Sequence, residues 1–138
     1  MVIKKLRDFG FNTDNRTYII AEIGINHRGD IKIAKQLIDS AARSGVDAVK
    51  FQTYITEQRA PKGNNEVFKL LKDLELPFEA FKELKEYAKQ YDVDFFSTPF
   101  DNESVDLLDK LDTPCFKTAS MDINNLPFLK YIAKQNKP

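Results

Sequence analysis

Apolar residues change spacing along the chain, and the change predicts strands that alternate with helices. Residues Tyr18 to Ile23 form a nearly unbroken apolar run, typical of a strand covered on both faces of a parallel sheet. From Ile31 to Ala42 the apolar residues recur at helical spacing, with Asp30 placed to cap this helix and Gly45 to close it. Val46 to Phe51 then resumes a strand. A strand, a crossover helix and a parallel strand form a βαβ unit, so we predict the α/β class.

The same alternation continues through the rest of the chain. Further strands are predicted at Val93 to Phe96 and Pro114 to Thr118, and further helices at Val67 to Leu74, about Phe78 to Gln90, Asn102 to Leu111, and Asn124 or Asn125 to Gln135. The stretch Thr56 to Glu66 is rich in Pro, Gly and Asn, which indicates a long loop over the strand ends. Residues 1–17 alternate loosely and end in turn formers, which predicts an N-terminal β-hairpin that caps a barrel.

Two architectures contain a parallel sheet in which every strand alternates with a helix: an open doubly wound sheet and an eight-stranded barrel. A doubly wound nucleotide binder carries a glycine-rich phosphate loop after its first strand, and the sequence there, EIGINHRGD, lacks that pattern. Polar or ionisable groups instead follow every predicted strand, as the catalytic face of a barrel requires. We therefore expect the first four βα units of a (β/α)8 TIM-type barrel over residues 18–138.

Composition excludes several functional classes. Lys and Arg total 21, and Asp and Glu also total 21, so no basic surplus points to nucleic acid. No apolar run reaches the roughly 18 residues of a membrane-spanning helix, and no leader with a cleavage site is evident, so we expect no membrane association and a cytoplasmic protein. The single cysteine, Cys115, excludes an internal disulfide, and its apolar neighbours predict a small buried hydrophobe.

Two lysines, Lys50 and Lys117, each follow an apolar strand-like run (DAVK and PCFK). Burying an ammonium group without a partner is expensive, so each is expected to have an anionic partner. Two explanations compete: internal pairing with Glu22 or Asp122, or binding of an anionic substrate such as a phosphate or a carboxylate. A Schiff base with a carbonyl substrate is a third use of a lysine in a barrel.

Other polar side chains at the strand ends add to this anion site. The hydroxyl groups are of the kind that surrounds phosphate oxygens, and they belong to Ser97, Thr98 and Ser120. Glu22 suits a general acid or base, a metal ligand or an ion-pair partner in equal measure. His27 is the only histidine in the sequence, and a lone histidine is a weak signal for a metal.

Four ordered motifs, AEIGINHRGD, DAVKFQTY, FFSTPFD and FKTASMDINNLPFLKYIAKQNKP, resemble the N-terminal half of the sialic acid synthase family. That family includes the N-acetylneuraminate, legionaminate and pseudaminate synthases and their spore-coat polysaccharide homologues. The resemblance implies a carbon–carbon bond-forming transferase that condenses phosphoenolpyruvate with an N-acetylated mannosamine-type sugar. It also implies a divalent metal, Mn²⁺ or Mg²⁺, and no Schiff base.

The resemblance assigns roles at the matching positions. Lys50 and Lys117 would bind the phosphate and carboxylate of phosphoenolpyruvate, with Thr98 and Ser120 donating hydrogen bonds and Gln52 lining the pocket. Glu22 would position the sugar or move a proton, and Asp122 would lie near the water that attacks C2. Many members of the family have glycine at the position of Met121, so the pocket is expected to differ in shape there.

Length is the main departure from the family. Its metal-binding histidines lie on later strands, and a C-terminal antifreeze-like domain reaches over the partner's active site in a homodimer. We therefore expect no metal ligands in this chain, a half-barrel without the C-terminal half and antifreeze-like domain, and no activity from these residues alone. The alternatives are a noncatalytic half-barrel that self-associates or binds a complementing chain, and a Schiff-base aldolase that uses Lys117.

Overall fold

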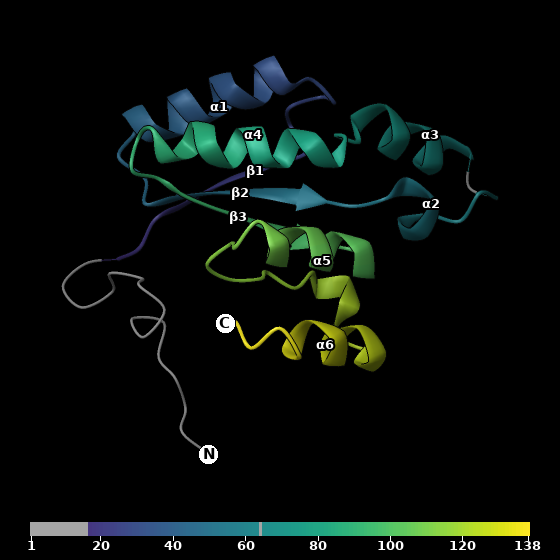
Figure 1. The fold of residues 1–138 in the computed structure, drawn as a ribbon. Coiled ribbons are helices and arrows are strands. Elements are labelled where there is room, and N and C mark those ends of the chain that lie inside the picture. Colours follow the sequence, from purple (N-terminus) through teal and green to yellow (C-terminus); the bar gives the residue numbers. More distant parts are fainter. Residues whose placement is uncertain (1–16, 64) are drawn as a thin grey trace.

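The computed structural model describes residues 17–63 and 65–138, so the hairpin predicted over residues 1–17 lies almost entirely outside the described residues. Each strand is followed by one or more helices, as Figure 1 shows. The order is β1 (Ile20–Gly24), α1 (Ile31–Arg43), β2 (Ala48–Thr53), α2 (Thr56–Arg59), α3 (Asn65–Leu74), α4 (Phe78–Lys89), β3 (Asp94–Pro99), α5 (Asn102–Lys110), a 3₁₀ turn η2 (Ser120–Asp122) and α6 (Leu126–Ala133). The α/β class predicted from the alternation is confirmed.

The three strands form a parallel sheet in the order β1-β2-β3. The fourth predicted strand, Pro114 to Thr118, is wrong in extent, because only one isolated parallel bridge, between Ser97 and Phe116, joins this segment to β3. The backbone explains the difference. The N–H of Lys117 donates to the carbonyl of Ser97 at 3.4 Å, a long hydrogen bond, while the N–H of Phe116 faces the other side and donates to the carbonyl of Pro138 at 2.9 Å, so pairing with β3 is limited to this one bridge.

The helices begin where the sequence places capping residues. Asp30 accepts from the N–H of Lys32 at α1, and Asp101 accepts from the N–H of Ser104 at α5, as their short polar side chains predict. Gly45 follows α1 with φ +75°, the left-handed conformation that ends many helices. Among the described residues, no helix combines the length and the apolar composition that crossing a membrane requires.

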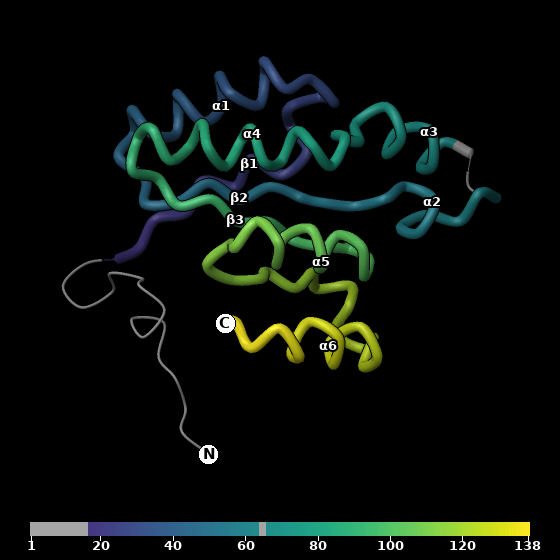
Figure 2. The backbone as a smooth tube through the Cα atoms, in the orientation of Figure 1, coloured from purple at the N-terminus to yellow at the C-terminus, as the bar shows by residue number. Residues whose placement is uncertain are grey.

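The loop predicted from Thr56 to Glu66 contains the short helix α2, which the sequence analysis missed. Its four residues, TEQR, are too few to show helical periodicity. Side chains from elsewhere in the chain hold the turn. The N–H of Ile55 donates to Asp101 Oδ2 at 2.8 Å, and the hydroxyl of Thr56 donates to Glu75 Oε2 at 2.5 Å. Figure 2 shows the backbone passing from β2 through α2 and α3, then returning along the sheet as α4.

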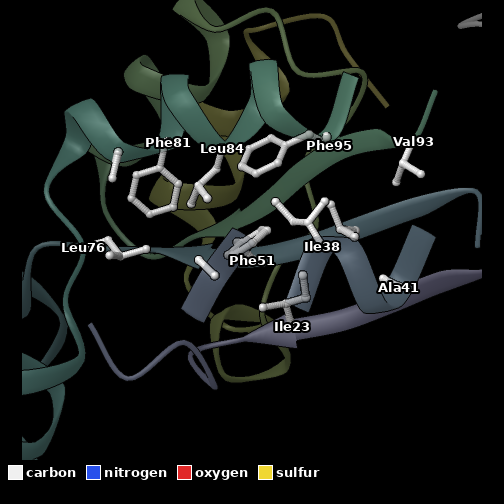
Figure 3. Packing of buried hydrophobic residues seen from close by; sticks show 13 residues of the cluster. Ile23, Ile38, Ala41, Phe51, Leu76, Phe81, Leu84, Val93 and Phe95 are labelled. Atoms are coloured by element: carbon white, nitrogen blue, oxygen red, sulfur yellow. The ribbon is translucent and has the colours of Figure 1, made fainter. Parts of the chain in front are cut away.

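The main core lies between the sheet and helices α1 and α4. Figure 3 shows Ile38 of α1 and Phe81 and Leu84 of α4 packed around Phe51 and Phe95 of the sheet, and all five side chains are at least 97% buried. Fully burying side chains of this size contributes about 1.5–3 kcal/mol each. A separate cluster of Val105, Leu108, Phe116, Phe128 and Ile132 joins α5 and α6 to the segment after α5. The core therefore fixes one face of the sheet and leaves the other for polar groups.

Candidate functional site

A buried ammonium group lies at the centre of the polar face of the sheet. Lys50 Nζ is 2.8 Å from Glu22 Oε2 and donates to Thr98 Oγ1 at 3.1 Å. The Lys50 side chain is only 7% exposed, whereas that of Glu22 is 63% exposed. Three strands thus contribute one group each, and the cluster opens to solvent on the side of Glu22.

The strand register brings these groups together. Glu22 is paired with Lys50 across β1 and β2, and Gln52 with Thr98 across β2 and β3. Side chains two residues apart on a strand share a face, so Lys50 and Gln52 project together, opposite the core residue Phe51. The register of β1 shifts between Glu22 and Gly24, where Ile23 is left out of the pairing before Gly24 pairs with Phe51.

The donors of Lys50 limit what this cluster can do. An ammonium group has three N–H donors, and two of them have partners in Glu22 and Thr98. The third N–H donor is available to an oxygen of a bound anion. Glu22 is more exposed than Lys50, and its carboxylate can also accept a proton or a hydrogen bond from a ligand. Next to it, Gln52 Oε1 is buried without a hydrogen-bond partner among the described residues. Internal pairing of Lys50 with Glu22 is present, and among the described residues it leaves one N–H donor of the ammonium group without a partner of its own.

Three of the predicted site residues lie in different surroundings. Ser97 is fully buried and shares a 2.7 Å hydrogen bond with Thr53, and strand alternation places it on the core face, opposite Thr98. The expectation of a shielded Lys117 is wrong, because this side chain is exposed and donates to the carbonyl oxygen of Thr118 at 2.6 Å. Ser120 is also exposed. The structure therefore brings together Glu22, Lys50, Gln52 and Thr98, and leaves the roles of the other residues as predictions.

Asp122 is buried on the 3₁₀ turn that follows the bridged segment, and it is only 8% exposed. Its Oδ2 atom is buried and has no hydrogen-bond partner among the described residues. An unpaired buried carboxylate oxygen is expensive, so Asp122 Oδ2 is expected to accept a hydrogen bond from a group outside the described residues. The predicted polar role of Asp122 is compatible with this position.

His27 and Cys115 are poor candidates for chemistry. His27 is 1% exposed and stacks on Phe51 with 6.0 Å between ring centroids. Burial lowers the pKa of His27, and the Gly24 backbone offsets only part of this. Burial, with the charge of Asp94 acting in the same direction, raises the pKa of the Cys115 thiol to about 12, as expected of a structural cysteine.

The sequence analysis missed an aromatic clamp around Arg59, the last residue of α2. The guanidinium carbon lies 3.8 Å from the ring centroid of Phe100 and 4.5 Å from that of Tyr54. Each ring comes directly after a strand, Tyr54 after β2 and Phe100 after β3. That position was the available signal, because an aromatic residue immediately beyond a strand lies at the same edge of the sheet as the strand-end polar groups.

Comparison with known proteins identifies the family. Residues 37–138 match the NeuB family, which is about three quarters of the chain. The chain belongs to the NeuB family. It is 49% identical over 122 residues to an uncharacterized protein of Methanocaldococcus jannaschii, in a match covering 88% of this chain and 36% of that protein. It is 47% identical over 135 residues to N,N'-diacetyllegionaminic acid synthase of Campylobacter jejuni, covering 88% and 40%.

Solved structures agree with this assignment to the NeuB family. The N-acetylneuraminic acid synthetase of Leptospira borgpetersenii, determined in complex with citrate, matches with a TM-score of 0.85 and 37% identity, covering 89% of this chain and 43% of that one. The resemblance to sialic acid synthases found in the motifs is thus confirmed. The chain spans about two fifths of the length of these relatives.

Proposed function

We propose that the protein containing these residues condenses phosphoenolpyruvate with an N-acetylated mannosamine-type sugar. C3 of the enol attacks the aldehyde carbon of the sugar, water attacks C2, and phosphate leaves with cleavage of the C–O bond, which yields a nine-carbon sialic-type acid. Kinship with a legionaminic acid synthase and an N-acetylneuraminic acid synthetase supports the synthesis of a sugar acid. Such an enzyme is a carbon–carbon bond-forming transferase.

The buried Lys50 is the single observation that carries this proposal. Phosphoenolpyruvate has several anionic oxygens, and the third N–H donor of Lys50 can bind one of them beside the hydroxyl of Thr98. Glu22 is bonded to the same ammonium and is mostly solvent-exposed, so it can orient a sugar hydroxyl or transfer a proton. Gln52 would bind a substrate N–H or O–H donor with its unpartnered Oε1.

The sheet itself supports a barrel. Its strands are parallel and helices connect them, and the polar groups lie on the face opposite the helices α1 and α4. In a (β/α)8 barrel the helices surround the strands and the active site lies at the carboxyl ends of the strands. We propose that Lys50, Glu22 and Thr98 face the interior of such a barrel.

A divalent metal, Mn²⁺ or Mg²⁺, is implied by the family and would polarise the sugar aldehyde. The described residues do not fit such a site, since they contain no group of three or more His, Cys, Asp or Glu side chains placed to hold an ion. His27, the histidine of the sequence, is buried against an aromatic ring. We therefore assign no metal-dependent step to the residues of this chain.

Phosphate release from phosphoenolpyruvate, measured with an N-acetylated mannosamine-type sugar in the full-length protein, tests the proposal. Lys50→Met should raise the KM for phosphoenolpyruvate about tenfold to a hundredfold, the effect of losing one charge-assisted hydrogen bond. The KM for the sugar should change far less. The matched control is Lys110→Met at an exposed lysine. Equal increases in both KM values, or no phosphate release by the unmodified protein, would contradict the proposal.

One observation favours a second reading, a half-barrel that associates with itself or with a complementing chain. Ile19 and Ile20, at the edge strand β1, are 47% and 41% exposed, and an open apolar edge promotes association. Sedimentation of residues 1–138 over a range of concentrations tests this, and we expect these residues alone to release no phosphate. Nothing favours a Schiff base at the exposed Lys117, and borohydride trapping with pyruvate should leave no adduct.

A further inference from the structure

The clamp around Arg59 is fixed in place before any ligand arrives. Tyr54 and Phe100 contact each other edge to face at 6.3 Å and 88°, and the hydroxyl of Tyr54 donates to the carbonyl of Leu71 at 2.9 Å. Hydrogen bonds to Asp101 and Glu75 hold the first residues of α2, so the backbone that carries Arg59 is anchored on both sides. The guanidinium carbon lies within cation–π distance of both rings, which limits the directions in which its N–H donors can point.

One nitrogen of the guanidinium group of Arg59, Nη1, is buried and lacks a hydrogen-bond acceptor among the described residues. Burial lowers the pKa of Arg59, whereas the charges of Tyr54 and Asp122 act in the opposite direction. A buried N–H donor without an acceptor is costly, so Nη1 is expected to bind an oxygen atom.

Among the described residues, Asp122 has a buried acceptor atom that lacks a donor, whereas Arg59 has a buried donor atom that lacks an acceptor. Asp122 is close enough for its charge to act on Arg59, yet Oδ2 is buried without a partner, and no ion pair joins the two within the described part of the chain. One group that both accepts from Arg59 and donates to Asp122 would satisfy both atoms. A hydroxyl group does both, whereas a phosphate or carboxylate would be repelled by Asp122.

Space for a larger ligand adjoins the clamp. A hollow of about 300 Å³ is lined by Phe100, which is also a wall of the clamp, and by Asn125, whose N–H donates to the carbonyl of Asp122 at 2.9 Å. Gln58 and Asn102 add further amide groups to its lining. The carboxylate of Asp101, which also lines it, already accepts two backbone N–H groups. The hollow therefore suits a neutral, polyhydroxylated molecule.

We propose that Arg59 and Asp122 together bind one hydroxyl group of the sugar acceptor, and that Arg59 helps to select the acceptor. This inference rests on the proposed function for the identity of the sugar. It places sugar recognition at the loop that follows β2, the strand that carries Lys50. Arg59 is then a specificity-determining residue with no part in bond making.

Kinetics of the full-length protein with Arg59→Met test the inference. Methionine retains much of the apolar stem and removes the donors, so the KM for the sugar should rise about tenfold to a hundredfold, with the KM for phosphoenolpyruvate changed less than about twofold. Arg59→Lys should recover only part of the loss, since an ammonium lacks the planar fork. The control is Arg43→Met at an exposed arginine of α1, which should behave as the unmodified protein.

Deoxy-sugars identify the hydroxyl. The sugar analogue that lacks the hydroxyl bound by Arg59 should have the same KM with the unmodified protein and with Arg59→Met. Every other monodeoxy analogue should still have a higher KM with Arg59→Met than with the unmodified protein. If no analogue removes the difference, or if Arg59→Met matches Arg43→Met, Arg59 and Asp122 hold only a structural water and the inference is overturned. If the unmodified protein still releases phosphate from phosphoenolpyruvate and the sugar when the inference about Arg59 fails, the proposed function stands. If the unmodified protein does not turn over, calorimetric titration with N-acetylmannosamine decides: weaker binding to folded Arg59→Met supports the inference, and equal or absent binding overturns it.

Discussion

Replacing either partner of the ion pair between Lys50 and Glu22 should affect stability very differently, because only Lys50 is buried. Lys50 is 7% exposed and Glu22 is 63% exposed. In Lys50→Met, the remaining carboxylate is hydrated and needs no partner. In Glu22→Gln, the remaining ammonium is still buried, with the amide oxygen and Thr98 as its acceptors.

The magnitudes follow from these surroundings. Lys50→Met loses an ion pair to an exposed carboxylate, worth about 0–1 kcal/mol, and a hydrogen bond to Thr98 worth about 1 kcal/mol. It also removes the desolvation penalty of a buried ammonium, which amounts to several kcal/mol after relaxation. The free energy of unfolding should therefore stay within about 1 kcal/mol of the unmodified value or increase. Glu22→Gln removes the charge of the carboxylate that pairs with Lys50 among the described residues, so it should lower the free energy of unfolding by about 1–3 kcal/mol.

Urea unfolding at pH 7, followed by circular dichroism, measures both values. Phosphate release measured on the same full-length variants should show a higher KM for phosphoenolpyruvate in Lys50→Met, although this protein is as stable as the unmodified one. Glu22→Gln should lose kcat together with some stability, so part of its effect is structural. A loss of more than about 3 kcal/mol in Lys50→Met, with Glu22→Gln unchanged, would refute the assignment of Lys50 as a buried group stabilised by Glu22.

Three further predictions concern acid stability, thiol reactivity and a tight loop. Hydrogen bonds from Tyr91 and Tyr87 lower the pKa of Asp39, so Asp39→Asn should reduce the free energy of unfolding above pH 5. The difference in stability between the two proteins should vanish as the pH falls below the pKa of Asp39 in the folded protein. A difference that stays constant during acid titration would contradict this. With a pKa of about 12, Cys115 should be about a thousandfold less thiolate at pH 8 than a free cysteine, and react with a disulfide reagent rapidly only after unfolding. Urea unfolding should show a larger loss of stability for Gly29→Ala than for Gly45→Ala. Both glycines have positive φ, but only at Gly29 would an added Cβ lie 2.5 Å from a backbone oxygen, that of Asp73. Equal losses of stability would exclude that contact.

Periodicity predicted the elements with long apolar patterns and failed where the pattern was short or interrupted. The helices α1, α4 and α5 were predicted closely, because each has several turns of apolar spacing and α1 and α5 carry a capping aspartate. Helix α2 was missed because tertiary hydrogen bonds to Asp101 and Glu75 hold it, and no local pattern encodes them. The fourth strand was overestimated because an apolar run indicates burial but does not show how many backbone groups pair with the neighbouring strand, and here one bridge, between Ser97 and Phe116, forms.

The candidate site was predictable to the extent that strand ends meet at one edge of a parallel sheet. That rule correctly brought together Glu22, Lys50 and Thr98. It could not tell which face of a strand a residue occupies, so Ser97, one position from Thr98, was assigned to the pocket although it lies on the core face. The sequence also did not show which lysine side chain is exposed, because Lys117 follows the same kind of apolar run as Lys50 although only Lys50 is buried.

The carboxylate of Asp101 links two loops of the site mechanically. One oxygen accepts the N–H of Ser104 at the start of α5, and the other accepts the N–H of Ile55 just before α2, both at under 3 Å. Because one carboxylate accepts from both segments, a movement of the Asp101 side chain would release the N–H of Ile55 and the N–H of Ser104 together, and the two amide protons should then exchange with solvent through a common opening event. Arg59 is carried on the first loop and the hollow beside Asn102 on the second. Asp101 thus couples the loop after β2 to the start of α5.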